Sequence, residues 1–153
     1  MSIGFNIRMV NNNDLPALQE LYLNIADNKV VPLTSEKLKI WEEIIASPDY
    51  YILIGEDRGV IITSISMVII RNITRDFSPY ALIENVVVDE KYRRGEYTGL
   101  LLDRAVEIAK ERGCYKVMIT TGTRSEATLT MYEQRGFSGG DKRAFSMRLG
   151  NNH

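Results

Sequence analysis

The residues with the clearest chemical potential lie in one stretch, where a run of valines leads into arginines and glycines. Val86–Val88 is followed by Arg93 and Arg94, with glycines at Gly95 and Gly99. The start of a helix leaves backbone N–H groups unpaired and carries partial positive charge. Glycine lets the backbone approach a ligand closely, and arginine has donor geometry that suits phosphate. The stretch therefore fits a phosphate or pyrophosphate cradle, and it equally fits an ordinary strand-to-helix turn with a solvated basic pair.

The segments on either side must hold this stretch in place, and their patterns predict a strand before it and a helix after it. The β-branched run favours a buried strand within residues 81–89. From Gly99 the apolar residues recur at helical spacing, and Gly113 follows as a stop after Lys110 and Arg112. The sequence contains neither a P-loop motif nor a dinucleotide-binding fingerprint, so those two classes of phosphate site are excluded.

Hydrophobic alternation and turn residues predict further strands. Their expected ranges are 5–10, 50–55, 60–70, 115–120 and one or two closing strands within 137–149. Residues 56–59 are expected to form a hairpin turn, and residues 71–80 a polar loop.

Capping residues predict three further helices. One begins after Asp14, one is capped by Thr34 or Ser35, and one opens with a capping box of Thr123 and Glu126 and ends at residue 134. The second of these is expected to turn three apolar side chains inward: Leu38, Trp41 and Ile45.

The order of elements predicts an α/β fold, a mixed sheet with helices on both faces. The length of 153 residues fits a single domain over 1–150 with a tail of 151–153. The formal net charge of −1 gives no basis for broad attraction to nucleic acid or to a membrane surface. The longest apolar runs are too short to span a bilayer.

Cysteine and histidine are scarce, which narrows the possible chemistry. The single cysteine, Cys114, allows no internal disulfide and suits a reducing cytosol. It follows Gly113 at the start of an apolar strand, where a buried structural role is favoured over a nucleophile. The only histidine is His153, the last residue, so neither histidine-based catalysis nor a metal site is expected.

A hexapeptide resembles the Arg/Gln-x-x-Gly-x-Gly/Ala loop of the GNAT superfamily of N-acetyltransferases: Arg94, Gly95, Glu96, Tyr97, Thr98 and Gly99. In that superfamily the loop grips the pyrophosphate of acetyl-CoA. Tyr97 departs from the pattern, because glycine is usual there and a bulky side chain does not easily take positive φ. Met131–Phe137 is similar to the superfamily's helix that ends in Tyr-Glu-x-x-Gly-Phe. The resemblance covers nearly the whole chain and implies a central mixed sheet flanked by about four helices.

This resemblance also implies roles for individual residues. Val86, Val87 and Val88 would pair with the pantetheine arm of acetyl-CoA, and a backbone N–H near Val87 or Val88 would face the thioester oxygen. Tyr132 is the expected general acid, because a phenol with a pKa near 10 can protonate a thiolate with a pKa near 8.5; the alternative is a packed aromatic residue.

Glu84 is the expected general base or water-orienting residue, because an acceptor amine must lose a proton before it attacks. The alternative is a solvated or structurally paired glutamate. Strict strand alternation puts Glu84 on the face of Val86 and Val88, opposite Val87.

Some segments are similar to glucosamine-6-phosphate N-acetyltransferases, among them residues 83–88 and 113–117. Arg71, Arg75 and Lys142 would then supply phosphate contacts. The expected function is transfer of an acetyl group from acetyl-CoA to a primary amine of a small molecule, such as an amino sugar phosphate, by direct attack. A cytoplasmic homodimer without metal is expected. The alternatives are a catalytically degenerate acyl-CoA-binding or regulatory module, and a protein or peptide N-acetyltransferase.

Overall fold

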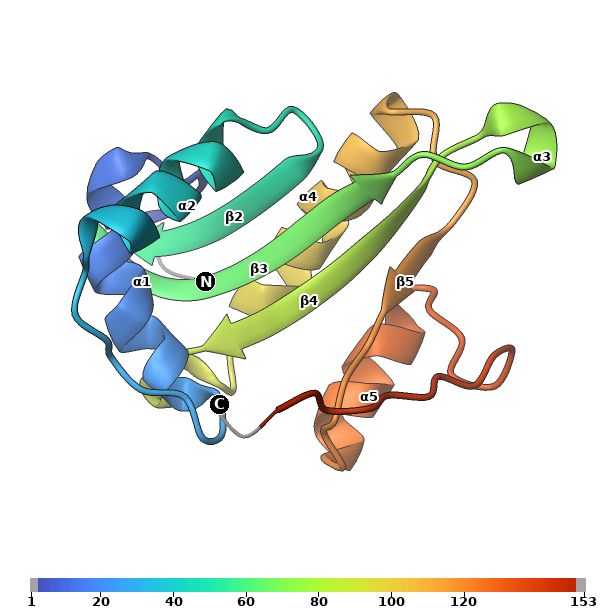
Figure 1. Cartoon of the computed structure of the whole chain (residues 1–153). Coiled ribbons are helices and arrows are strands. Elements are labelled where there is room, and N and C mark those ends of the chain that lie inside the picture. Colours follow the sequence, from blue (N-terminus) through green and yellow to red (C-terminus); the bar gives the residue numbers. More distant parts are fainter. Residues whose placement is uncertain (1–2, 151–153) are drawn as a thin grey trace.

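A computed structural model describes residues 3–150 of the chain, which are built around one five-stranded sheet (Figure 1). The predicted tail of residues 151–153, which includes His153, lies outside the described residues. The strands lie in sequence order, antiparallel except that β5 runs parallel to β4. Their bounds are β1 (Phe5–Met9), β2 (Tyr50–Asp57), β3 (Val60–Ile70), β4 (Tyr80–Val88) and β5 (Val117–Ile119).

Helices cover both faces of this sheet, as the alternation of elements predicts. Figure 1 shows α1 and α2 in front of the strands and α4 behind them. The helices are α1 (Leu15–Leu21), α2 (Ser35–Ala46), α3 (Thr74–Phe77), α4 (Tyr97–Glu111) and α5 (Glu126–Gln134). The predicted mixed α/β fold is therefore confirmed.

Two apolar clusters hold the layers together, one on each face of the sheet. On the front face, Leu18 of α1 and Trp41 of α2 pack against Ile52 and Ile54 of β2. On the back face, α4 packs on the central strands, and Tyr132 of α5 joins that cluster. Burial of these side chains supplies most of the driving force for folding.

Local signals at turns and helix ends explain most element boundaries. Thr34 caps α2, since its hydroxyl accepts from the backbone N–H of Lys37 at 3.3 Å. Arg58 and Gly59 have φ of 50° and 81°, as a two-residue hairpin turn requires. One predicted core residue is wrong: Leu38 is 40% exposed, whereas Trp41 is buried.

The predicted capping box of Thr123 and Glu126 is wrong. The side chain of Ser125 caps α5 by accepting from the backbone N–H of Thr128, and Glu126 is already the first helical residue. The hydroxyl of Thr123 instead accepts from the backbone N–H of Ser125. The cap therefore lies directly before the helix, two residues later than predicted.

The predicted polar loop of residues 71–80 contains the short turn α3. Arg75, Asp76 and Phe77 have φ between 54° and 58°, so this turn is left-handed.

The closing strands predicted within residues 137–149 are absent from the described structure. Phe145, Met147 and Leu149 do alternate with smaller or polar residues, but each is at least 80% exposed. A period of two makes a strand only where a neighbour offers a hydrogen-bonding edge, and no described strand pairs with this segment.

The regular alternation of β4 breaks at Asn85, whose φ of 53° lies in the left-handed region. Ser66 of β3 faces Glu84, but Ser64 faces Val87, so β4 carries one extra residue between the two pairs. This is a β-bulge, and asparagine tolerates its left-handed conformation better than most residues do.

The bulge changes which side chains share a face of the sheet. Glu84 lies on the face of Val87, whereas Val86 packs against the cluster on the α4 face. The predicted alternation, with Glu84 beside Val86 and Val88 and opposite Val87, is therefore wrong, because it assumed an unbroken strand.

Past the bulge, β4 loses its neighbour on one side. β5 pairs with β4 only from Ala81 to Ile83, and no described strand lies beside Val86–Val88 on that edge. The backbone N–H of Asp89 donates to the carbonyl of Ile62 in β3 at 2.7 Å. By the alternation of an antiparallel ladder, the N–H of Val88 points the other way, toward the open edge.

The bulge gives a direct stability prediction. We expect Asn85→Val to lower the free energy of unfolding by about 1–2 kcal/mol, because a β-branched residue is strained at positive φ. Asn85→Gly, the matched control, should keep the bulge and leave stability within about 1 kcal/mol. Urea denaturation measures both variants. Equal stability of Asn85→Val and wild type would contradict the assigned conformation.

Candidate active site

The open edge of β4 leads directly into a helix N-terminus. Asp89 begins the connecting turn, where its carboxylate accepts from the backbone N–H of Lys91 at 2.9 Å. The chain then enters α4 at Tyr97, two residues earlier than predicted. Glu96 at the N-cap makes no side-chain capping hydrogen bond, so the first-turn amides of α4 have no side-chain partner at the cap. Arg93 and Arg94 are exposed beside them, and this end of the helix therefore suits an anion.

Tyr97 does not obstruct the turn. It adopts helical rather than positive φ as the first residue of α4. Its ring packs on Phe5 of β1 with a centroid distance of 4.8 Å, and on Tyr92 at 5.6 Å. Tyr97 can therefore replace the usual glycine, because its ring packs beside the helix against Phe5 and Tyr92.

This cluster also explains Gly95. A Cβ at Gly95 would lie 2.3 Å from Cε2 of Tyr97, so a larger residue has no room. The sequence suggests that this glycine lets backbone approach a ligand, which stays a prediction; the structure adds that it makes room for the ring of Tyr97.

Gly99 is constrained by a residue that the sequence did not single out, Arg135. A Cβ at Gly99 would lie 2.2 Å from the guanidinium of Arg135, which also pairs with Asp103. Arg135 follows α5, so it ties that helix to the first turns of α4. One sequence signal could have pointed to Arg135: it directly precedes Gly136, a glycine at the end of α5. In the structure Gly136 has φ of 98°.

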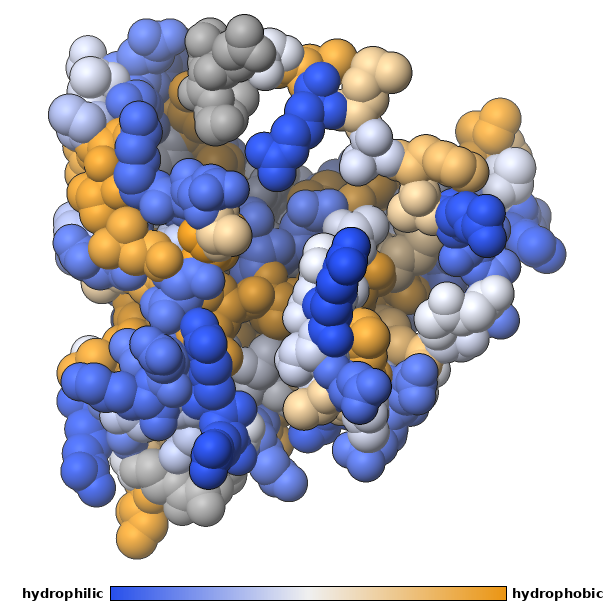
Figure 2. Space-filling view, turned by 90° about the horizontal axis from the view of Figure 1, so that it is seen from below, coloured by the Kyte–Doolittle hydropathy of each residue, from blue (hydrophilic) through white to orange (hydrophobic). Residues whose placement is uncertain are grey.

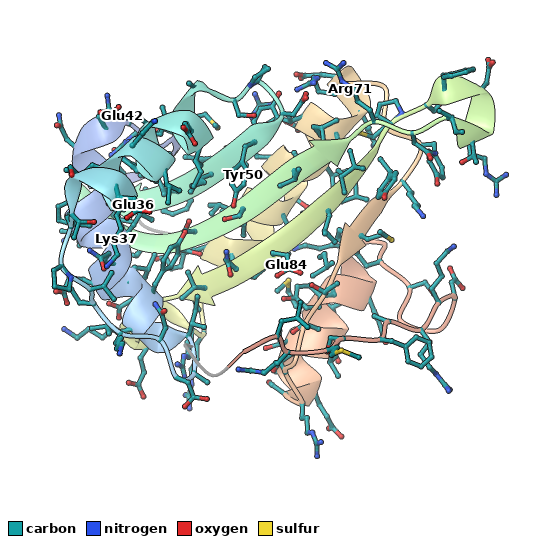
Figure 3. The ribbon with its side chains drawn as sticks, in the orientation of Figure 1. Glu36, Lys37, Glu42, Tyr50, Arg71 and Glu84 are labelled. Carbon is teal, nitrogen blue, oxygen red and sulfur yellow. The ribbon has the colours of Figure 1, made fainter. Side chains whose placement is uncertain are left out.

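Glu84 lies where α1 and α2 leave the sheet open (Figure 3). Its side chain is exposed, and its carboxylate accepts a hydrogen bond from the hydroxyl of Thr120 at 2.5 Å. Thr120 directly follows β5, so this bond spans the place where β4 and β5 part. The carboxylate is thus both accessible and oriented.

Tyr132 lies on the other face of the sheet, 7% exposed in the cluster beneath α4. Its ring meets that of Phe137 edge-on at 6.4 Å. Burial raises the pKa of the Tyr132 hydroxyl, and a hydrogen bond with Thr121 opposes that rise. The phenol therefore carries its proton at neutral pH.

The structure thus gathers the predicted residues around one feature, the parting of β4 and β5. Glu84 is bonded to Thr120 on one face of the sheet, and Tyr132 lies in the cluster on the other. Figure 2 shows the molecule hollowed between the side that carries α5 and the rest of the surface, with apolar side chains inside the hollow. An elongated ligand could enter here along the edge of β4.

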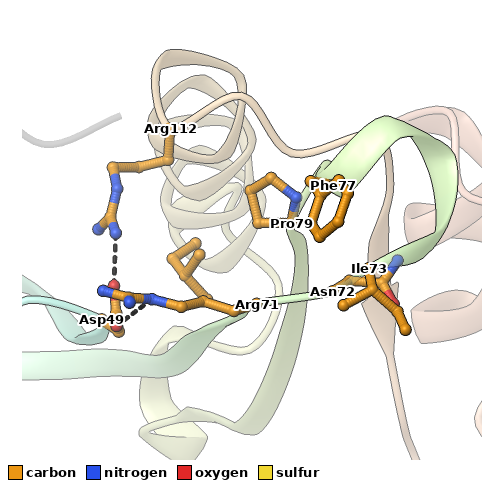
Figure 4. Close-up of a pocket in the computed structure, with 8 residues that line it drawn as sticks. Asp49, Arg71, Asn72, Ile73, Phe77, Pro79 and Arg112 are labelled. Carbon is orange, nitrogen blue, oxygen red and sulfur yellow. Dashed lines mark hydrogen bonds and ion pairs between the residues drawn. The ribbon is translucent and has the colours of Figure 1, made fainter.

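The three basic residues expected to contact phosphate have different partners. Arg71 lies 3.9 Å from the carboxylate of Asp49, beside a cavity of about 550 Å³ (Figure 4). Arg75 stacks over the ring of Tyr115, and Lys142 is exposed. The cavity includes neither Glu84 nor Tyr132, so it is separate from the parting of the strands.

Arg112 lines the same cavity and fastens the end of α4 to the start of β2. Its guanidinium donates to the carbonyl of Pro48 and the hydroxyl of Tyr51, each at 2.7 Å, and to the carboxylate of Asp49. These bonds engage Arg112 in a structural contact.

Cys114 is half-buried against the cluster under α4, in line with the structural role predicted for it. Burial raises the pKa of its thiol, which disfavours the reactive thiolate. Within residues 3–150, no group of three or more His, Cys, Asp and Glu side chains could hold a metal ion. No helix in that range is long and apolar enough to cross a membrane.

The contact between Gly95 and Tyr97 can be tested by a double-mutant cycle. We expect Gly95→Ala to destabilise the protein by about 1–3 kcal/mol, because the new methyl group overpacks against the ring. In a Tyr97→Ala background the same change should have almost no effect. Thermal or urea unfolding of the four proteins gives the coupling, and additive effects would show that the ring does not occupy this space.

Comparisons with known proteins agree with this geometry. The Acetyltransferase (GNAT) family matches residues 16–137. A glucosamine 6-phosphate N-acetyltransferase of Trypanosoma brucei brucei is 38% identical over 79 residues, which is 52% of each chain. The chain spans about half the length of the curated relatives it matches.

Two solved structures resemble nearly the whole chain. A putative acetyltransferase from Agrobacterium tumefaciens is 34% identical with a TM-score of 0.83, over 94% of this chain and 99% of that one. Glucosamine-6-phosphate N-acetyltransferase from Arabidopsis thaliana is 26% identical with a TM-score of 0.78, over 95% and 97%. The fold, the loop before α4 and the family match lead to one conclusion: the chain belongs to the GNAT acetyltransferase family.

Proposed function

We propose that this protein is an acetyl-CoA-dependent N-acetyltransferase that acts on a primary amine of a small molecule by direct attack. The observation that supports the proposal is that three features adjoin one another. The first is the N-terminus of α4, which has no side-chain cap and is flanked by two exposed arginines; the second is the open edge of β4; the third is the pair Glu84 and Tyr132. This arrangement suits a long ligand that has a pyrophosphate at one end and a reactive group at the other.

The residues present fit acetyl-CoA. The first-turn amides of α4, from Tyr97 to Gly99, together with Arg93 and Arg94, would hold the pyrophosphate. The open edge of Val86–Val88 would pair with the pantetheine arm, as an added strand does. The N–H of Val88 points toward this edge and would donate to the thioester oxygen. When bound, acetyl-CoA supplies an activated acetyl group.

Glu84 and Tyr132 would manage the two protons of the reaction. Glu84 accepts a proton from the acceptor ammonium, directly or through water, so that the free amine can form the new C–N bond. Tyr132, whose buried phenol is protonated beforehand, donates its proton to the sulfur as the C–S bond breaks. The second proton, which the nitrogen loses as the amide forms, returns to the phenol through water. Base and acid lie on different faces of the sheet, so the acceptor would enter from the face that Glu84 shares.

An amino sugar phosphate is the first acceptor class to test. The support is the match to proteins named glucosamine 6-phosphate N-acetyltransferase. The open face beside Glu84 would admit a small polar amine (Figure 3).

A homodimer in the cytoplasm completes the proposal. Phe145, Met147 and Leu149 are each at least 80% exposed, and they alternate on a segment that no described strand pairs with. Large apolar side chains that gather on a surface mark interaction sites. The unpaired Cys114 suits a reducing compartment.

The cofactor cradle makes a quantitative prediction. We expect Arg94→Ala to weaken binding of acetyl-CoA by about 1.5–3 kcal/mol, the range for a hydrogen bond to a charged group. Arg104→Ala, farther along α4, is the matched control and should bind normally. Calorimetric titration measures all three proteins. Equal affinity of Arg94→Ala and wild type would remove this loop from the site.

Turnover measurements test whether the protein acetylates amines and whether Tyr132 is the general acid. We expect wild type to release coenzyme A with at least one member of a panel of primary amines that includes glucosamine 6-phosphate. Tyr132→Phe should lower kcat by about 10²–10⁴-fold, the contribution of a general acid, with little change in acetyl-CoA affinity. Tyr80→Phe serves as the control, because the ring of Tyr80 meets that of Tyr115 edge-on and this contact does not need the hydroxyl.

Three outcomes would count against parts of the proposal. Acetyl-CoA binding without turnover on any amine would support a degenerate binding module. Turnover on peptides but not on free amines would support a protein acetyltransferase. Full activity of Tyr132→Phe would exclude Tyr132 as the acid.

A further inference from the structure

A threonine that directly follows β5 contacts the residue that would take up a proton. The hydroxyl of Thr120 donates to Oε1 of Glu84 at 2.5 Å. This bond joins the end of β5 to β4.

The register of the sheet explains why Thr120 reaches Glu84. Ile119 of β5 lies opposite Ile83 of β4, and both pack into the cluster beneath α4. One step further along each strand, Thr120 and Glu84 therefore both point to the open face.

The parallel pairing of β4 and β5 ends at this point. The backbone N–H of Thr120 still approaches the carbonyl of Ile83, at 3.4 Å, but no ladder pair follows it. At this point the side-chain bond from Thr120 to Glu84 adds a link across the parting of the two strands.

A hydroxyl suits this task. Glu84 is exposed and long, so its carboxylate would otherwise sample many rotamers. One hydrogen bond to Oε1 orients it and leaves Oε2 to accept a proton. A threonine hydroxyl can donate this bond, and it carries no charge that would compete for the proton.

We propose that Thr120 is a positioning residue, which holds Glu84 in place beside the parted strands. The inference rests on the proposed function. Thr120 does not contact the reacting atoms: it acts through the carboxylate it binds.

The test for Thr120 is a double-mutant cycle with Glu84. Thr120→Val, which keeps the shape and removes the hydroxyl, should lower kcat roughly 3- to 10-fold, the factor expected for one lost hydrogen bond. KM for acetyl-CoA should not change, and Thr120→Ser should restore kcat. In a Glu84→Gln background, Thr120→Val should have no further effect on kcat.

The matched control is Thr130→Val, which removes an exposed hydroxyl from α5 and should leave kcat unchanged. Turnover is measured with the panel amine that wild type acetylates fastest.

The outcomes separate this inference from the function it rests on. A wild type that acetylates no amine refutes the proposed function. An active wild type with fully active Thr120→Val refutes the inference alone. A loss that persists undiminished in the Glu84→Gln background also overturns it, because it would show that Thr120 acts through general stability.

Discussion

The extra residue at Asn85 is the constraint on which the rest of the site depends. It interrupts the pairing of β3 with β4, and β4 loses its contact with β5 at almost the same level. Strands that stayed paired along their whole length would leave no backbone donor free and no path through the sheet. Because β4 bends out of register here, the N–H of Val88 faces an open edge.

The surrounding contacts keep this opening in shape. Arg135 ties the end of α5 to the first turns of α4, and Arg112 ties the other end of α4 to β2. The ring of Tyr97 packs on Phe5 of β1, so the loop before α4 is also held to the far edge of the sheet. The N-terminal end of α4 and the parted strands are therefore held in one frame.

The sequence allowed the mixed sheet, the order of elements and the strand–loop–helix unit to be predicted, because periodicity and caps are local signals. The face of Glu84 could not be predicted, since the bulge depends on pairing with β3. The roles of Gly95 and Gly99 were likewise hidden, because the side chains that crowd them come from Tyr97 and Arg135. The prediction of closing strands was wrong because a local pattern was present without its partner: residues 145–149 have the right period but no described partner strand.

A crystal structure with coenzyme A bound tests the central claim most directly. We expect the pyrophosphate at the first-turn amides of α4, from Tyr97 to Gly99, and the pantetheine arm along Val86–Val88. The sulfur should then lie within hydrogen-bonding reach of Tyr132, with the bulge at Asn85 retained. Coenzyme A bound elsewhere, for example in the cavity beside Arg71 and Arg112, would contradict it, as would a β4 that closes against β5.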